Sequence, residues 1–203
     1  MEQTENMVTL RGMLLGLPEF SHENHGRRFF RMTLEVARLS GAVDLLPVVL
    51  EENLLGNMDP SGGSMISVKG QIRSHNIRTD GIRHLMIFVF ATEISSCEGE
   101  PINDVSITGI CCRLPVYRRT PLGREICDVM LAVQRPFRRA DYLPCILWGS
   151  TAKLAAECQI RDRIKISGRL QSRIYTKMTD DGPEDRTAYE ISALTAEFPD
   201  LVA

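Results

Sequence analysis

Long apolar runs are missing from this chain of 203 residues, and so is a secretory leader. Its apolar stretches are only as long as β-strands, whereas a membrane-spanning helix needs about 20 consecutive apolar residues. The chain begins Met1-Glu2-Gln3-Thr4-Glu5, which is polar and acidic rather than basic and then apolar. We therefore expect a cytosolic protein with no membrane partner.

Catalytic signatures are also missing. The sequence contains no G-x-x-x-x-G-K-[ST] phosphate loop, no G-x-S-x-G nucleophile turn and no H-E-x-x-H zinc motif. Of its four histidines, only His22 and His25, which flank Glu23 in one loop, make even a weak candidate metal site. The six cysteines lack C-x-x-C spacing and mostly fall in apolar runs, which indicates buried reduced thiols rather than zinc ligands. We predict no enzymatic activity, no metal and no cofactor.

An excess of positive charge is absent overall, because 24 Lys and Arg face 26 Asp and Glu, for a net charge of −2. The average hides an asymmetry between the two halves. Residues 1–103 have nine cationic and thirteen acidic side chains, net −4, whereas residues 104–203 have fifteen and thirteen, net +2. A phosphate-binding groove needs local rather than overall positive potential, so the second half could provide one.

What the sequence does contain is a repeat of itself. Setting Val8 over Val105, a shift of 97 positions, aligns the halves without a gap from residue 8 to residue 50. The matched pairs include Gly12 with Gly109, Arg38 with Arg135, Asp44 with Asp141, and Pro47 with Pro144; with a shift of 98, Gly70 matches Gly168 and Ser74 matches Ser172. A unit of this length exceeds the 20 to 50 residues of solenoid repeats, so it predicts two complete small domains.

Each copy has the pattern of short strands separated by turn residues. In the second copy we expect strands over 104–112, 124–135, 142–148, 164–175 and 185–198, a helix over 151–159 and a polar turn over 115–123. In the first copy we expect strands near 7–15, 26–38, 43–50, 64–77 and 82–94, with a weaker helix around 51–58. Five strands with a helix between the third and fourth is the order of an OB-fold, a partly open barrel. We predict an all-β protein of two tandem OB-folds, with an N-terminal domain 1–95, a linker 96–103 and a C-terminal domain 104–203.

Candidate binding residues follow from side-chain alternation along the strands of the second copy. In its third strand, Leu143, Cys145 and Leu147 form one face, and Tyr142, Pro144, Ile146 and Trp148 form the other. In its fourth strand, Ile164, Ile166, Leu170 and Ile174 form a predicted core face opposite a cationic one. The predicted nucleic-acid-binding residues are Phe137, Tyr142, Trp148 and Tyr175 as rings and Arg118, Arg135, Arg138, Arg139, Lys165, Arg169 and Arg173 as cations. Guanidinium groups pair with phosphates and rings stack on bases. The rings could instead pack against the helix or another subunit, and the arginines could simply be solvated.

Several stretches of the second copy carry a family resemblance. Residues 105–109 (VSITG), 131–137 (LAVQRPF), 141–148 (DYLPCILW) and 168–175 (GRLQSRIY) together resemble bacterial single-stranded DNA-binding proteins, and the first copy resembles them faintly. The resemblance implies binding of single-stranded DNA without strong sequence preference during replication, recombination or repair. It also implies a homodimer presenting four OB-folds in the bacterial cytoplasm, associated with the nucleoid. The family usually ends in an acidic tail that recruits partners, whereas this chain ends at residues 198–203 (FPDLVA), so we do not expect that recruitment.

The two copies differ at the ring positions. The first copy has Ser40, Leu45, Glu51 and Ile77 where the second has Phe137, Tyr142, Trp148 and Tyr175. Stacking contributes about 1–3 kcal/mol per ring, so these losses should weaken binding and leave the fold intact. We therefore expect the C-terminal domain to bind DNA and the N-terminal domain mainly to build the assembly. Weak phosphate contacts could still come from Arg27, Arg28, Arg31, Arg73, Arg78 and Arg83.

Two other functions remain open at this point. An OB-fold adaptor of the primosome type, acting through protein contacts, would also explain a degenerate first copy. Binding of single-stranded RNA is possible too, because a stacking groove tolerates either nucleic acid. The polar hairpin over 176–185 could lengthen the groove, although Asp180, Asp181, Glu184 and Asp185 make it acidic.

Overall fold

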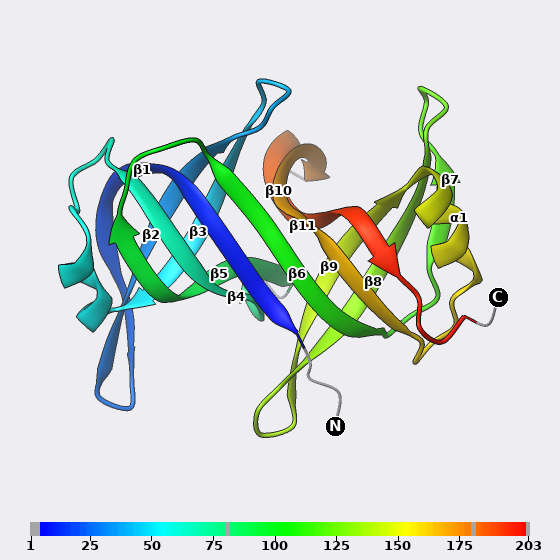
Figure 1. The fold of residues 1–203 in the computed structure, drawn as a ribbon, viewed down its shortest axis with the longest axis horizontal. Coiled ribbons are helices and arrows are strands. Elements are labelled where there is room, and N and C mark those ends of the chain that lie inside the picture. Colours follow the sequence, from blue (N-terminus) through cyan, green and yellow to red (C-terminus); the bar gives the residue numbers. More distant parts are fainter. Residues whose placement is uncertain (1–4, 80–81, 180–181, 202–203) are drawn as a thin grey trace.

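The computed structural model describes residues 5–79, 82–179 and 182–201, which form two halves that each close a five-stranded barrel (Figure 1). The strands of the first half are β1 (Asn6–Asn24), β2 (Arg27–Ala37), β3 (Val43–Glu51), β4 (Met65–Thr79) and β5 (Ile82–Ser96). Around the barrel they follow the order β1-β2-β3-β5-β4 and return to β1. Between β3 and β4 lies the 3-10 helix η1 (Glu52–Asn57), where the sequence predicts its weaker helix.

The second half repeats this arrangement. Its barrel strands are β6 (Ile102–Cys111), β8 (Glu125–Arg135), β9 (Arg139–Trp148), β10 (Arg163–Thr179) and β11 (Gly182–Glu197), in the order β6-β8-β9-β11-β10. The helix α1 (Gly149–Glu157) lies between β9 and β10. The prediction of an all-β protein with two tandem OB-folds is confirmed.

Two details of the second half differ from the sequence prediction. Within the predicted turn 115–123 lies a further strand, β7 (Val116–Arg119), which pairs with β8 so that Tyr117 lies opposite Cys127. All four residues of β7 are exposed, so no inward–outward alternation marked it in the sequence. The prediction that Ile174 is a core residue is wrong, because this residue is 72% exposed. There β10 has left the barrel and pairs only with β11 in a projecting hairpin.

An antiparallel pairing of β1 with β6 joins the two barrels into one continuous sheet. In it Val8 lies opposite Val105, and these are the same two residues that the repeat alignment superposes. Such self-pairing requires an approximate two-fold axis between the halves, and Figure 1 shows it: the β1–β2 hairpin (blue) and the β7–β8 hairpin (green) lie at opposite ends of the molecule.

Each half also reaches into the other through a fully buried carboxylate. The Oδ1 atom of Asp44 accepts hydrogen bonds from the backbone N–H of Ser172 (2.7 Å) and from its hydroxyl (3.1 Å). The guanidinium of Arg38 donates to the same carboxylate, with its Nε 2.6 Å from Oδ2. The contact with Asp44 raises the pKa of Arg38 against the opposing effect of burial.

The equivalent carboxylate in the second half makes the reciprocal contact. Asp141, also fully buried, accepts from the backbone N–H of Ser74 at 2.8 Å. Two guanidiniums, those of Arg73 (3.2 Å) and Arg135 (3.3 Å), lie against it. The pairs Arg38/Arg135, Asp44/Asp141 and Ser74/Ser172 that match in the repeat are therefore the residues that hold the halves together.

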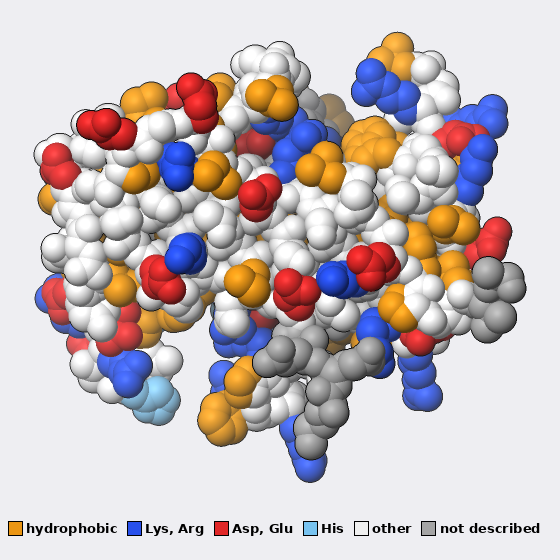
Figure 2. Space-filling view, in the orientation of Figure 1, with side chains coloured by type: hydrophobic (Ala, Val, Ile, Leu, Met, Phe, Trp, Pro, Cys, Tyr) orange, Lys and Arg blue, Asp and Glu red, His pale blue; other side chains and the backbone are white. Residues whose placement is uncertain are grey.

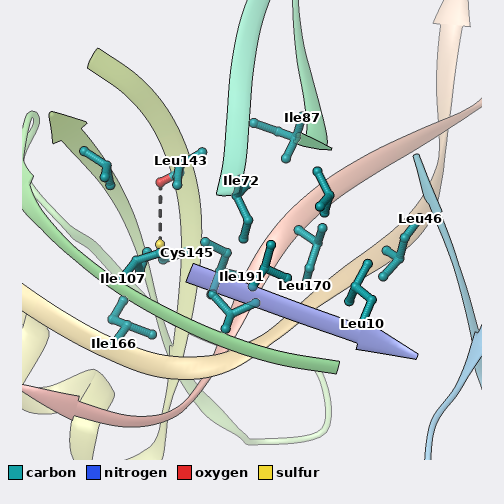
Figure 3. Packing of buried hydrophobic residues seen from close by; sticks show 14 of the residues in the cluster. Leu10, Leu46, Ile72, Ile87, Ile107, Leu143, Cys145, Ile166, Leu170 and Ile191 are labelled. Carbon is teal, nitrogen blue, oxygen red and sulfur yellow. Dashed lines mark hydrogen bonds between the residues drawn. The ribbon is translucent and has the colours of Figure 1, made fainter. Parts of the chain in front are cut away.

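The core of each barrel is filled by the inward side chains of its strands (Figure 3). The predicted inward set of β9, namely Leu143, Cys145 and Leu147, is buried as expected. The Sγ atom of Cys145 lies 3.5 Å from the carbonyl oxygen of Leu143 as a weak hydrogen-bond donor (Figure 3). At Gly168 the chain approaches β11 so closely that a Cβ would lie 2.2 Å from the carbonyl oxygen of Ser192.

Candidate nucleic-acid interface

The outer face of the second barrel carries the candidate rings, beginning on β9. Tyr142 is 45% exposed and Trp148 is half-buried, as the alternation predicts. The indole N–H of Trp148 donates to the hydroxyl of Ser192 on β11 at 3.0 Å, which fixes the orientation of the ring. Ile146 shares this face but is only 5% exposed, because β8 and β11 flank it on both sides. The outer face of β9 therefore offers two rings rather than a continuous apolar strip.

On β10 the same face becomes cationic. Tyr175 is 37% exposed, and the guanidinium of Arg173 lies 5.6 Å from its ring centroid. Arg173 is also 4.0 Å from Glu190 on β11. The Nε atom of Arg169 is buried and has no hydrogen-bond partner among the described residues, while its Nη2 lies 3.4 Å from Gln171 Oε1. A buried donor without a partner is costly, so Arg169 is suited to accept an anionic oxygen from outside the chain.

A groove of about 700 Å³ lies between the two halves and meets this face. Tyr175 and Pro144 line it from the second half, and Ile77 and Pro47 line it at the equivalent positions of the first half. The lining also includes Arg186, whose guanidinium pairs with Glu184 at 2.7 Å. The groove is therefore apolar at its centre, on the approximate two-fold axis, and charged toward the β10–β11 hairpin.

Phe137 stands apart from the other rings, at the tip of the β8–β9 hairpin. It is 94% exposed, and both Phe137 (φ 62°) and Arg138 (φ 56°) have left-handed backbone conformations. Such conformations are unfavourable for residues other than glycine, and the first half has Gly41 where the second has Arg138. A strained turn that presents an exposed ring between arginines is a reasonable candidate for ligand contact.

The structure divides the predicted cations into two groups. Arg118 pairs with Asp128 at 2.6 Å, and that hydrogen bond raises the pKa of the guanidinium. Arg135 lies against the buried Asp141, and Lys165 lies 3.9 Å from Glu197 in a separate groove next to β6. In the described part of the chain no acidic partner is seen for Arg138 or Arg139. The latter two are therefore better placed to meet phosphates than Arg118 or Arg135.

Charge over the molecule is mixed rather than uniformly basic. Figure 2 shows acidic and basic side chains interspersed on one face, with Lys and Arg gathered in the hollow between the halves near the β10–β11 hairpin. Of that hairpin, positions 180 and 181 lie outside the described residues. Thr176 and Asp185 bridge its two strands at 2.7 Å, so one of its acidic groups is engaged internally.

The expectation that the first half offers no rings is too simple. Phe20 is 51% exposed on the β1–β2 hairpin and meets Phe30 edge-on, with ring centroids 5.9 Å apart. Arg28 covers Phe20 at 5.3 Å, and half-buried Phe88 and Phe90 lie on β5. The repeat alignment missed these rings because it compares only equivalent positions, and they lie elsewhere. Four of the first half's candidate arginines, Arg27, Arg28, Arg31 and Arg73, pair with acids, and the side chain of Arg83 lies outside the described residues.

The other chemical candidates do not assemble into a site. Within residues 5–79, 82–179 and 182–201 no three His, Cys, Asp or Glu side chains converge as metal ligands, and His22 instead stacks on Phe29. The cysteines are unpaired, four of them buried, and burial raises the pKa of Cys127 to about 11. Among the described residues no helix is long and apolar enough to cross a membrane.

Comparisons with known proteins agree with this geometry. The model of the "Single-strand binding protein family" matches residues 102–199. Single-stranded DNA-binding protein B of Bacillus subtilis is 35% identical over 107 residues, covering 48% of this chain and 90% of that protein. For the single-stranded DNA-binding protein of Oceanobacillus iheyensis the identity is 30% over 106 residues, and the chain covers 63% of its length.

Among solved structures, the chain resembles a deletion mutant of the single-stranded DNA binding protein from Thermus aquaticus. The TM-score is 0.78 at 25% identity, with 98% of this chain and 96% of that chain covered. This similarity extends over both halves, whereas the family model covers mainly the second. The chain belongs to the single-strand binding protein family, in a form with two OB-folds.

Proposed function

We propose that the chain binds single-stranded DNA through the outer face of its second barrel, without strong sequence preference and without catalysis. The observation that carries the proposal is the placement of Trp148, Tyr175 and Arg173 on one exposed face of a family member. Unpaired bases stack on rings of this kind, and the arginine meets the backbone. A duplex keeps its bases stacked inside, so the same surface favours single strands.

Each predicted residue has a part in this binding. Trp148, Tyr175, Tyr142 and Phe137 are the stacking rings, and Arg169, Arg173, Arg138 and Arg139 attract the backbone. Arg118, Arg135 and Lys165 are held by acids, so their contribution is mainly to position the surface. The division into an N-terminal domain 1–95, a linker 96–103 and a DNA-binding domain 104–203 belongs to the same proposal.

The assembly and the setting follow from the family. Two chains form a homodimer with four OB-folds, in the bacterial cytoplasm at the nucleoid. There the protein covers exposed strands during replication, recombination or repair, as its relatives' names as DNA-binding proteins suggest. Recruitment of partners through an acidic tail is not part of the proposal.

Fluorescence of Trp148, the chain's only tryptophan, tests the proposal. We expect oligo(dT) to quench its emission, and a duplex of the same length to leave it nearly unchanged. The affinity should fall as salt rises, because bound phosphates release counterions. Absence of binding by both quenching and anisotropy, or equal binding of the duplex, would refute the proposal. An oligo(U) titration compares RNA with DNA.

A further inference from the structure

The outer face of the first barrel has rings at a position that its partner barrel leaves polar. Strand pairing identifies the equivalence: Phe90 lies beside Val49 and opposite Gln71, whereas Ser192 lies beside Ile146 and opposite Arg169. Phe90 therefore occupies in the first barrel the place of Ser192 in the second. By the same register, Phe88 occupies the place of Glu190.

This equivalence shows a ring moved by one strand. In the second barrel Trp148 on β9 touches Ser192 on β11 through its indole N–H. In the first barrel, the position of Trp148 is taken by Glu51 on β3 and the position of Ser192 by Phe90 on β5. The outer face has kept an aromatic group at nearly the same place, from the neighbouring strand.

Phe90 is part of a row of rings and cations. Its centroid is 6.1 Å from that of Phe29, and Phe29 stacks on His22 with centroids 4.9 Å apart and planes at 12°. On the other side, the guanidinium of Arg73 lies 5.9 Å from the Phe90 centroid. His22 is exposed and Phe90 half-buried, so the row is accessible at both rings.

The electrostatics of this face suit a polyanion better than the sequence suggests. Glu51, which would repel phosphate at the Trp148 position, lies 3.5 Å from the Arg27 guanidinium. The acid that accompanies Arg173 in the second barrel, Glu190, is replaced here by Phe88. Bases rather than phosphates would therefore meet this part of the surface, with Arg73 and Arg27 at its edges.

A continuous path joins this face to the second half. A shallow groove of about 350 Å³ is lined by Gln71 and Arg73 of the first half and by Arg135 and Pro136 of the second. Pro136 precedes Phe137 at the tip of the β8–β9 hairpin. A strand leaving that hairpin can pass Arg73 and reach Phe90 without crossing an acidic side chain in the lining of this groove.

We propose that the outer face of the first barrel, centred on Phe90 and Phe88, is a second base-stacking surface for the same single strand. This inference rests on the proposed function. It replaces the expected division of labour, in which the first half only builds the assembly, with a strand that crosses both halves of one chain.

The test uses the full chain with Phe90→Ser and Phe88→Glu, which copy the second half's residues. The matched control is Phe20→Ala, an exposed ring of the same half that contacts Phe30 and Arg28 instead. We expect the double variant to occlude fewer nucleotides on poly(dT) at saturation. Its affinity for long oligo(dT) should fall at least about fivefold per lost ring, while Phe20→Ala changes neither. If the double variant is unfolded by circular dichroism, Phe90→Leu, which removes the ring but keeps apolar volume, takes its place.

The outcomes separate the two proposals. If wild-type protein fails to bind oligo(dT), the proposed function itself is wrong. If wild type binds and the double variant matches it in site size and affinity, the second surface is refuted and the function stands. A change of oligomeric state with unchanged strand binding would assign this face to a second copy of the chain and also refute the proposal. Photo-crosslinking of oligo(dT) to peptides containing Phe88 and Phe90 would support it directly.

Discussion

Replacing Asp44 with alanine should loosen the connection between the two barrels. The carboxylate is fully buried and accepts hydrogen bonds from Arg38, from the backbone N–H of Ser172 and from the Ser172 hydroxyl. The substitution leaves a largely buried guanidinium and a backbone donor without partners. Breaking a buried ion pair from one side costs about 3–5 kcal/mol, so we expect a loss of that size in the free energy of unfolding. Asp44→Asn, which keeps an acceptor for Ser172, should cost less.

Urea unfolding measures this effect with two probes. Trp148 emission reports only the second half, whereas far-ultraviolet circular dichroism reports both. Because Asp44 belongs to the first half and Ser172 to the second, the variant should destabilise both signals. The control is Glu19→Ala, which removes an exposed ion pair with Arg31 and should cost less than about 1 kcal/mol. A loss below 1 kcal/mol for Asp44→Ala would refute the idea that these buried carboxylates join the halves.

Three further predictions concern binding, packing and thiol chemistry. Arg138→Ala with Arg139→Ala should reduce the slope of log affinity against log salt by about 1.4, at about 0.7 per lost phosphate contact on single strands, whereas Arg118→Ala, already paired with Asp128, should change it little in the same titration. Gly168→Ala should destabilise the fold by more than about 2 kcal/mol in urea, because its Cβ would lie 2.2 Å from a backbone oxygen; a neutral result would show that β10 and β11 can separate. Burial raises the pKa of Cys127 to about 11 and of Cys158 to about 12, so at pH 8 these thiols stay protonated and should not react with a thiolate-specific reagent until the protein unfolds, whereas half-buried Cys97 should react in the native state.

The sequence predicts the fold well because the signals for it are local. Alternation along residues 142–148 placed Leu143, Cys145 and Leu147 inside, and the internal repeat revealed two barrels of the same kind. Prediction failed where a residue's environment depends on distant chain. Ile174 has the spacing of a core residue, but nothing covers the hairpin to which it belongs. Ile146 fits an outward position and is buried by its two neighbouring strands.

The roles of the arginines were the hardest part to predict. Arg135 sits in a basic segment next to Phe137, which favours phosphate binding on local grounds. In the structure it lies against Asp141, a carboxylate that also receives Ser74 from the other half. That Arg38 and Asp44 repeat the pair in the copy without rings was the available signal that the pair is structural. The ring on Phe90 could be found only after strand pairing related β5 to β11.

The most direct test of the account is the affinity of the double variant Trp148→Ala, Tyr175→Ala for labelled oligo(dT), measured by fluorescence anisotropy at fixed salt. Two lost stacking rings, at about 1 kcal/mol or more each, should weaken binding about 30-fold or more while circular dichroism shows an intact barrel. Wild-type affinity in a folded double variant would contradict the claim that bases stack on the outer face of the second barrel.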